Sequence, residues 1–236
     1  MQAINERVST ISCGDLSTRA VNQAVREALA AGSTTVELFQ PGARHNLGVG
    51  LPEGLRLVID GSAGYYVGGL SDGALIEVHG SAGWGAGESM RDGTLVIDGD
   101  AGNAAAASIR AGTVVVRGDA STRAGIAMKG DALVVGGGVG PMSGFMMQKG
   151  VLIICGDAAG GLADSMYAGT VYLAGKTEEL GADAVEAEFG SYDHTIAYSL
   201  LDRWKIPAPA RFRKLISGRK LWNFQKADRE LWKTAL

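Results

Sequence analysis

Residues 61–98 read GSAGYYVGGLSDGALIEVHGSAGWGAGESMRDGTLVID and belong to a repetitive region from Gly42 to Gly175 that specifies the fold. Glycine recurs here at one position of a repeat, and each step is 19 residues long, without insertion or deletion. A repeat of this length indicates stacked copies of one supersecondary unit. We expect each glycine to end a strand at a sharp corner, where the missing Cβ permits a positive φ. The corner glycines are Gly42, Gly61, Gly80, Gly99, Gly118, Gly137, Gly156 and Gly175.

Two apolar columns precede the periodic glycines and predict one short strand per coil. An apolar residue stands four positions before the glycine, and another stands two positions before it, so the strand has an inward face of period two. A small residue follows each corner. The first column is Leu57, Ile76, Leu95, Val114, Leu133, Leu152 and Val171, and the second is Ile59, Val78, Ile97, Val116, Val135, Ile154 and Leu173.

These features predict a mainly β fold, a single-stranded right-handed parallel β-helix with coils of 19 residues. With rungs about 4.8 Å apart, the stack would be roughly 35 Å long. A leucine-rich repeat is the nearest alternative by length, but its leucine and asparagine signature is missing. A βαβ array is less favoured, because no segment between strands is long enough for a helix.

Helical segments are expected at both ends, which divides the chain into residues 1–35, 36–176 and 177–236. In the first part, Val8 to Cys13 resembles a strand, and Asp15 or Ser17 can cap a helix that ends at Gly32. The apolar stripe of this helix would cover one end or flank of the stack. The acidic segment from residue 177 to 189 is expected to be helical or capping, and a second helix is expected from residue 195 to 204.

The residue three positions before each corner glycine should point outward, yet this column is almost wholly apolar. Such a face should be covered, either by the terminal segments of the chain or by a partner subunit, and the sequence does not choose between them. The outward column is Val58, Glu77, Val96, Val115, Val134, Ile153 and Tyr172.

Charge is unevenly distributed along the chain. The formal net charge of −3 argues against a general nucleic-acid binder. Residues 191–236 hold ten Lys/Arg and four Asp/Glu, hence +6, which leaves −9 for residues 1–190. The basic segment is also aromatic and is typical of interface anchors. Candidate partner contacts are Tyr172, Arg213, Arg219, Trp222, Phe224 and Trp232.

The cysteines and the N-terminal sequence favour the cytoplasm. Cys13 and Cys155 lie far apart and have no metal-binding or redox spacing, which suits a reducing compartment. Residues 1–10 lack the pattern of a signal peptide, and no apolar run approaches the length of a membrane span. We therefore expect a cytoplasmic protein without membrane partners.

No catalytic or metal-binding constellation emerges from the residue pattern. The glycine-rich runs at residues 48–50 and 136–140 lack the Lys-Ser/Thr of a phosphate loop and are better explained as coil corners. His45, His79 and His194 have no identified nucleophile nearby, so structural or solvated roles are favoured. A methionine-rich column before the strands is interpreted as core.

The repeat run from Gly61 to Gly73, followed by Gly-Ser-Ala-Gly at residues 80–83 and Gly-Asp-Ala-Gly at residues 99–102, resembles the GXGXG β-helix domain. That domain ends the large subunit of glutamate synthase, and it recurs as a separate subunit and in the C subunit of formylmethanofuran dehydrogenase. The resemblance covers residues 19–175.

The resemblance implies a non-catalytic scaffold subunit of a glutamate-synthase-type complex, most like the separate GXGXG subunit of N-methylglutamate synthase. In that family a glutaminase-like subunit and a subunit with FMN and iron–sulfur clusters perform the chemistry, so no cofactor is expected on this chain. The alternatives are a C-type subunit of a formylmethanofuran-type enzyme and a separate structural rod. If the C-terminal segment is the anchor, deletion of residues 203–236 should release the partners and leave the rod folded.

Overall fold

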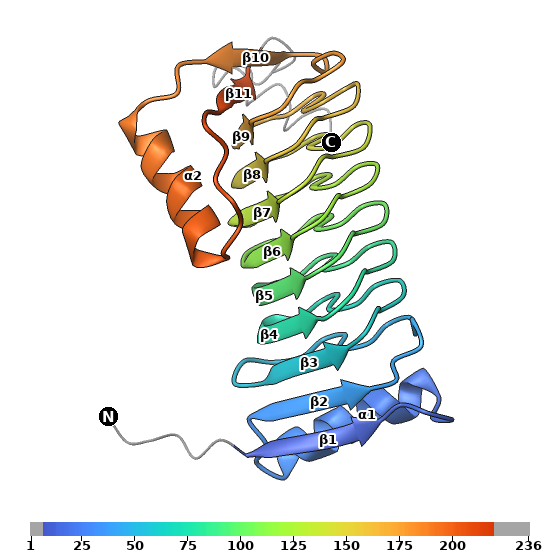
Figure 1. Cartoon of the computed structure of the whole chain (residues 1–236). Helices are drawn as coiled ribbons and strands as arrows, with labels where there is room; N and C mark the ends of the chain where they lie inside the picture. The colour runs from blue at the N-terminus through green and yellow to red at the C-terminus, as the bar shows by residue number, and fades with distance from the viewer. Residues whose placement is uncertain (1–6, 220–236) are drawn as a thin grey trace, which may run out of the picture.

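The computed structural model describes residues 7–219, which form a parallel β-solenoid with two helices. The coils stack in one direction, with strands on one side and turns on the other (Figure 1). The predicted mainly β solenoid is therefore confirmed. The elements are β1 Val8–Ser12, α1 Thr18–Ala30, β2 Thr35–Phe39, β3 Arg56–Asp60, β4 Asp72–Val78, β5 Asp92–Ile97, β6 Thr113–Val116, β7 Ala132–Val135, β8 Val151–Ile154, β9 Thr170–Leu173, β10 Ala184–Ala187, α2 Ser191–Arg203 and β11 Arg213–Ser217.

The strands form one sheet of eleven, in the order β1 to β9, then β11, then β10. Neighbouring strands from β1 to β9 are parallel, and equivalent repeat positions pair with each other, as in Leu95 with Val114 and Val114 with Leu133. Each apolar column is therefore stacked vertically in the interior. The two inward columns are fully buried, as is the methionine-rich column that contains Met128 and Met147, so its interpretation as core is confirmed.

Each coil turns through three residues with positive φ at alternate positions, and this feature was not predicted. In the coil that begins at Gly80, Gly85, Gly87 and Ser89 have φ of 66°, 69° and 57°. The middle residue is always glycine or alanine, because a larger side chain would meet the core; even a Cβ on Gly87 would lie 2.8 Å from the Val114 side chain. The seven triplets are 46/48/50, 66/68/70, 85/87/89, 104/106/108, 123/125/127, 142/144/146 and 161/163/165.

The corner glycines are needed for close packing more than for backbone angle. Only Gly42 and Gly61 among the eight have positive φ. The prediction that glycine is needed for a positive φ at the corner is therefore wrong for the other six. From Gly99 onward, each corner glycine donates its N–H to the glycine carbonyl of the preceding coil, as from Gly118 to Gly99 at 3.1 Å. A Cβ on Gly118 would lie 3.0 Å from that carbonyl oxygen. A side chain is excluded because successive coils touch backbone to backbone here.

The N-terminal segment extends the sheet and flanks its first strands. β1 pairs in parallel with β2, which pairs in parallel with β3, so this segment shares the sheet of the repeats. The Ser17 hydroxyl accepts a hydrogen bond from the Ala20 N–H at 3.2 Å at the start of α1, and Gly32 follows the helix with φ of 89°. Val21 and Val25 are buried against the first strands, which confirms the predicted helix and its apolar stripe.

At the other end, β10 and β11 close the solenoid. β11 pairs antiparallel with β9 on one side and with β10 on the other. The expectation of a helix between residues 177 and 189 is wrong, because the segment contains β10 instead, although it does cap the stack. The second helix is present as α2. Within residues 7–219, neither helix is long and apolar enough to cross a membrane.

Candidate interaction surfaces

The outward apolar column of the sheet is covered mainly by the chain itself. The C-terminal cover, defined as residues 191–212, consists of α2 and the segment that returns from it to β11. In Figure 1, α2 lies beside the strands of the upper half of the stack. Ala197, Leu201 and Phe212 pack on the outward residues of β5 to β9, which are Val96, Val115, Val134, Ile153 and Tyr172.

A buried polar cluster fastens the cover to the end of the sheet. The Tyr172 hydroxyl donates to Asp193 Oδ1 at 2.7 Å, and Lys214 Nζ lies 2.8 Å from the same oxygen. The Gly190 N–H donates to the other oxygen of Asp193 at 2.9 Å. Burial raises the pKa of Asp193, but the hydrogen bonds from Lys214, Tyr172 and Gly190 outweigh it, so this pKa is lowered overall. Burial and the Asp193 carboxylate raise the pKa of Tyr172.

Arg117 fastens the other end of the cover. Its Nε donates to Asp98 Oδ1 at 2.9 Å, and its NH1 group donates to the carbonyl of Trp204 at 2.7 Å. The second contact satisfies a carbonyl just beyond α2, where helical partners are lacking. Strands β3 and β4, nearer the N-terminus, are not covered by α2. They carry charged residues such as Arg56 and Glu77, whose side chains form an ion pair at 2.7 Å.

The predicted partner contacts therefore divide into three groups. Tyr172 is 1% exposed and lies beneath the C-terminal cover, so it does not present a surface to a partner. Arg213 lies in β11 and forms an ion pair with Glu186 of β10, and Arg219 lies at the end of the described chain. Trp222, Phe224 and Trp232 lie outside the described residues.

An exposed aromatic ladder lies on the turn side of the first coils. The ring of His45 stacks on Tyr65 with centroids 4.3 Å apart, and Tyr65 stacks on Trp84 at 5.3 Å. Tyr65 is 44% exposed and Trp84 is 55% exposed. His45 Nδ1 accepts the N–H of Tyr65 at 2.9 Å, which leaves Nε2 as the protonated nitrogen of the neutral ring.

Glycines make room for this ladder. A Cβ on Gly83 would lie 2.6 Å from the ring of Tyr65, and a Cβ on Gly102 would lie 2.7 Å from the ring of Trp84. Each ring therefore lies over the glycine of the next coil. The ladder was not predicted from the sequence, although the spacing of 19 residues between Tyr65 and Trp84 could have revealed it. Exposed Tyr and Trp side chains are the most frequent energetic centres of protein interfaces.

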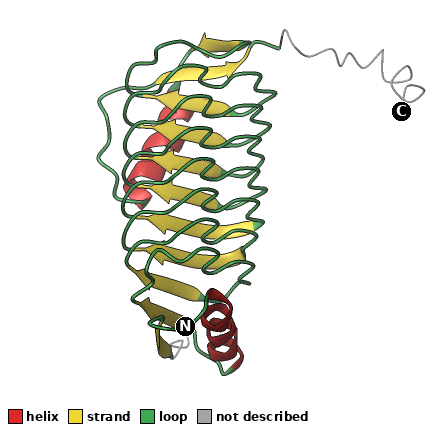
Figure 2. Ribbon diagram, turned by 90° about the vertical axis from the view of Figure 1, so that its right-hand side faces the viewer, coloured by secondary structure: helices red, strands yellow, loops and turns green. Residues whose placement is uncertain are grey.

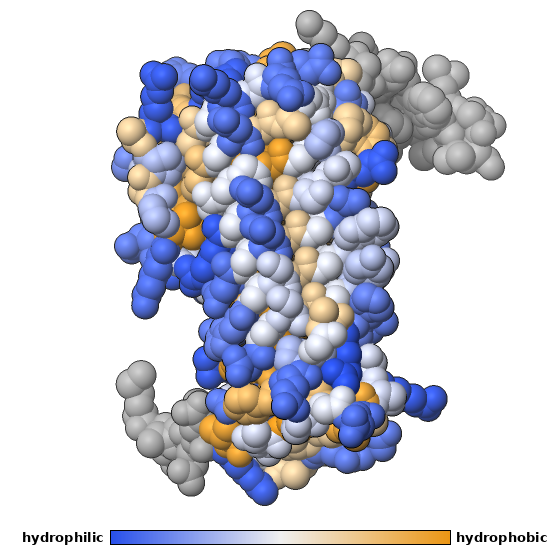
Figure 3. Space-filling model, turned by 45° about the vertical axis from the view of Figure 1, so that its right-hand side comes forward, coloured by the Kyte–Doolittle hydropathy of each residue, from blue (hydrophilic) through white to orange (hydrophobic). Residues whose placement is uncertain are grey.

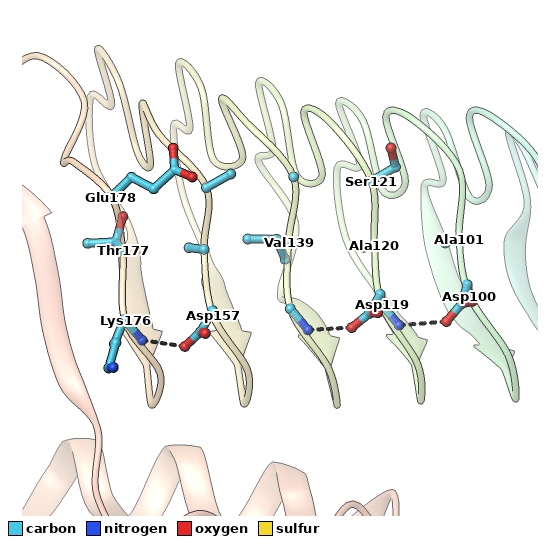
Figure 4. A pocket seen from close by; sticks show the side chains of 14 residues that line it. Asp100, Ala101, Asp119, Ala120, Ser121, Val139, Asp157, Lys176, Thr177 and Glu178 are labelled. Atoms are coloured by element: carbon cyan, nitrogen blue, oxygen red, sulfur yellow. Dashed lines mark hydrogen bonds between the residues drawn. The ribbon is translucent and has the colours of Figure 1, made fainter.

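A shallow acidic trough of about 790 Å³ follows the coil corners farther along the stack. Its floor is a column of small residues, and Asp100, Asp119 and Asp157 line one edge (Figure 4). Asp100 and Asp119 each accept the N–H of the equivalent residue in the next coil, at 2.8 and 2.7 Å, and Asp157 accepts the N–H of Lys176 at 2.6 Å. These carboxylates stabilise the stacking, and each uses only one oxygen to do so.

The histidines do not form a site. His45 belongs to the aromatic ladder, His79 is exposed after β4, and His194 stacks on Tyr198 at 4.2 Å. Across residues 7–219, no group of three or more His, Cys, Asp or Glu side chains is placed to hold a metal ion. The thiol of Cys155 is partly covered by the C-terminal cover, and burial raises its pKa to about 11.

Comparison with known proteins identifies the repeat. A search of curated proteins gave no match. The sequence model of the family described as GXGXG motif matches residues 8–194, which is most of the chain and includes all of the parallel strands. Two of the triplets of positive φ contain a glycine-x-glycine pair, at Gly48 and Gly50 and at Gly85 and Gly87. The chain therefore belongs to the GXGXG motif family, whose domain occurs in glutamate-synthase-type proteins.

Proposed function

We propose that this chain is a non-catalytic scaffold subunit of a glutamate-synthase-type complex, with N-methylglutamate synthase as the specific candidate. The observation that carries the proposal is the family match over residues 8–194, which include all of the parallel strands. A chain that consists mainly of the solenoid would depend on other subunits for its chemistry.

The side chains of the solenoid support a structural role. The carboxylates of Asp100, Asp119 and Asp157 cap backbone N–H groups, and Asp193 is held by three donors. The trough along the coil corners is lined by small residues and by carboxylates such as Asp119 and Glu178, which accept backbone N–H groups of neighbouring coils. We therefore place glutamine hydrolysis on a glutaminase-like partner, and FMN and iron–sulfur chemistry on a synthase-like partner.

The aromatic ladder is the docking surface that we propose for these partners. Tyr65 and Trp84 are held rigidly by stacking, so their burial in an interface would cost little conformational entropy. This surface replaces the outward apolar column, because that column is largely occupied by the C-terminal cover. The basic segment after residue 219 remains a second candidate anchor.

The proposal can be tested by purification of the tagged full-length chain from its native cells at low salt. Mass spectrometry should identify a glutaminase-like subunit and a synthase-like subunit, and the absorbance spectrum should show bound flavin. Recovery of molybdopterin or tungstopterin without flavin would contradict the proposal and favour a formylmethanofuran-type enzyme. Recovery of the chain alone, under conditions in which the other subunits are detected in the lysate, would also contradict it.

A paired variant locates the docking surface. Tyr65→Ser combined with Trp84→Ala should leave the chain folded, because both rings are exposed, and should remove the partners from the purified complex. Tyr192→Ala is the matched control, because Tyr192 is 76% exposed on α2, away from the ladder. Equal recovery of partners with both variants would exclude the aromatic ladder as the docking surface.

A further inference from the structure

A basic column runs along the turn side, just before the strands begin. Arg91, Arg110 and Lys129 occupy the same position in three successive coils, ahead of β5, β6 and β7, and Lys149 follows one position later in the next coil. All four are exposed, and none has an ion-pair partner within residues 7–219. The exposed carboxylates of Asp92 and Asp131 lie in the same segments but accept the N–H groups of Gly93 and Gly112, so the four cations remain in excess along this edge. Like charges stacked about 4.8 Å apart repel each other, so the column is suited to an oppositely charged surface.

An acidic column runs along the opposite edge of the same side. Asp100, Asp119 and Asp157 follow the strands, and all three are exposed, with one carboxylate oxygen left after backbone capping. Gly138 occupies the equivalent position between Asp119 and Asp157, and Lys176 occupies the one after Asp157. Figure 2 shows the turn side facing the viewer, with the parallel strands of the repeats pointing the same way behind the turns. Residues before the strands and residues after them therefore lie along opposite edges of this side.

Apolar residues occupy the turns between the two columns. Ile126, Met142, Phe145 and Met146 are each partly exposed in successive turns. Figure 3 views the molecule partly from this side and shows a narrow strip of neutral and weakly apolar residues that runs along the stack between hydrophilic patches. A surface with an apolar middle and charged edges has the composition of a modest protein interface.

We propose that this turn side is self-complementary and binds a second copy of the chain, with the two solenoids parallel. A two-fold axis parallel to the stack keeps each coil at its height and exchanges the two edges. The basic column of each copy then faces the acidic column of the other. An antiparallel pair, related by an axis that runs across the stack, would instead place like charges together.

The repeat also sets the register of this pair. Arg110 follows Asp100 by 10 residues and precedes Asp119 by 9 within coils of 19 residues. Its height along the stack is therefore about midway between those carboxylates, so each cation lies between two rungs of the facing column. A nucleic acid would be repelled by the acidic edge, and an acidic peptide would leave that edge unpaired. The second copy matches both edges.

The expected dimer is weak and sensitive to salt. The four coils from Arg91 to Asp157 present a surface of roughly 20 Å by 20 Å, which is at the low end for protein interfaces. The aromatic ladder belongs mainly to the preceding coils, so it would remain accessible to other partners in the dimer. The dimer does not depend on which enzyme subunits the chain joins, so its failure would not affect the proposed function.

Sedimentation of the full chain at several concentrations tests the proposal. We expect concentration-dependent dimers at about 0.1 M salt that dissociate at about 1 M, where the Debye length falls from about 10 to about 3 Å. Reversal of the basic column with Arg91→Glu, Arg110→Glu and Lys129→Glu should abolish the dimer. A monomer at every concentration, or a dimer that survives the reversal, would overturn the proposal.

A charge exchange makes the test specific. A second variant with Asp100→Lys, Asp119→Lys and Asp157→Lys should also be monomeric, whereas an equimolar mixture of the two variants should form a heterodimer. Asp100→Asn and Asp119→Asn together form the companion variant if the lysines disturb folding, because an amide oxygen can still cap the backbone. This variant should melt like the wild type and dimerise about tenfold more weakly. Unchanged dimerisation would contradict the pairing of the two columns.

Discussion

At the scale of single residues, this solenoid depends on positions that accept only glycine or alanine, because a larger side chain would collide with a neighbouring coil or with the core. The corner glycines allow successive backbones to touch, whereas the glycines and alanines in the middle of the turn triplets keep the core free of excess volume. Several outer triplet positions hold larger residues, such as Tyr66 and Arg123. A left-handed conformation costs roughly 1–2 kcal/mol for such a residue, so stacking contacts must offset a recurring local strain.

Gly118→Ala should destabilise the fold by about 1–3 kcal/mol, because the added methyl group would overlap Asp100 Oδ1 and lie 3.0 Å from the carbonyl oxygen of Gly99. Urea unfolding followed by circular dichroism measures the change. Gly160→Ala is the matched control, since its Cβ would meet nothing closer than 3.4 Å and its φ is not positive. Equal stability of both variants would refute the close-packing role of the corner glycines.

Asp193 should make the fold sensitive to acid. Its pKa is lowered from the ordinary value of 3.8 in the folded chain, so the unfolded chain binds the proton more readily. The stabilisation is present above the ordinary pKa and is lost as pH falls through the lowered pKa. Asp193→Asn should lower the melting temperature at pH 7 and flatten the loss of stability below pH 4. If the wild type and Asp193→Asn lost stability equally below pH 4, protonation of Asp193 would not be the cause of the acid sensitivity.

At the scale of elements, the C-terminal cover replaces the partner that an apolar outward face would otherwise require. α2 is only weakly amphipathic, and its buried residues Ala197 and Leu201 lie against a sheet whose strands are apolar on both faces. The Asp193 cluster holds the start of α2, and Arg117 holds the region just after its end. Between these two attachments the helix is held mainly by apolar packing.

Leu201→Ala should loosen this cover, because a buried leucine truncated to alanine typically costs about 2–5 kcal/mol. Cys155 reports the loosening, since its thiol is partly covered and has a pKa of about 11. In a Cys13→Ser background, alkylation of Cys155 at pH 8 should accelerate at least tenfold in Leu201→Ala. Tyr192→Ala, which changes an exposed residue of the same helix, should leave the rate unchanged. An unchanged rate in Leu201→Ala would show that the cover does not shield the thiol.

At the scale of the whole molecule, the described chain is a one-dimensional stack that is closed differently at its two ends. α1 flanks the first strands, and the antiparallel strands β10 and β11 close the last coil. Because each coil contacts mainly its neighbours, stability should accumulate from coil to coil, and the ends should determine whether the stack is soluble.

Deletion of residues 203–236 should therefore yield an unstable or aggregated chain, contrary to the expectation from sequence that the rod would remain folded. This deletion removes Phe212, Lys214 and all of β11, and so uncovers β9 and part of the outward column. Deletion of residues 220–236 alone retains every described contact and should preserve the melting curve. Size-exclusion chromatography and thermal melting compare the two. A soluble, cooperatively melting product of the longer deletion would contradict this role.

The solenoid, its repeat length and its inward columns could be predicted from the residues alone, because a strict period shows directly which side chains share an environment. The two helices could be predicted from segments outside the repeat. The sequence also indicated that the outward column must be covered. The covering of Val115 and Tyr172 by α2 could not be predicted, since apolar burial is satisfied equally well by the same chain or by another one. The aromatic ladder and the two charged columns likewise required the stacked coils, because residues separated by about 19 positions become neighbours only when the backbone has closed each turn.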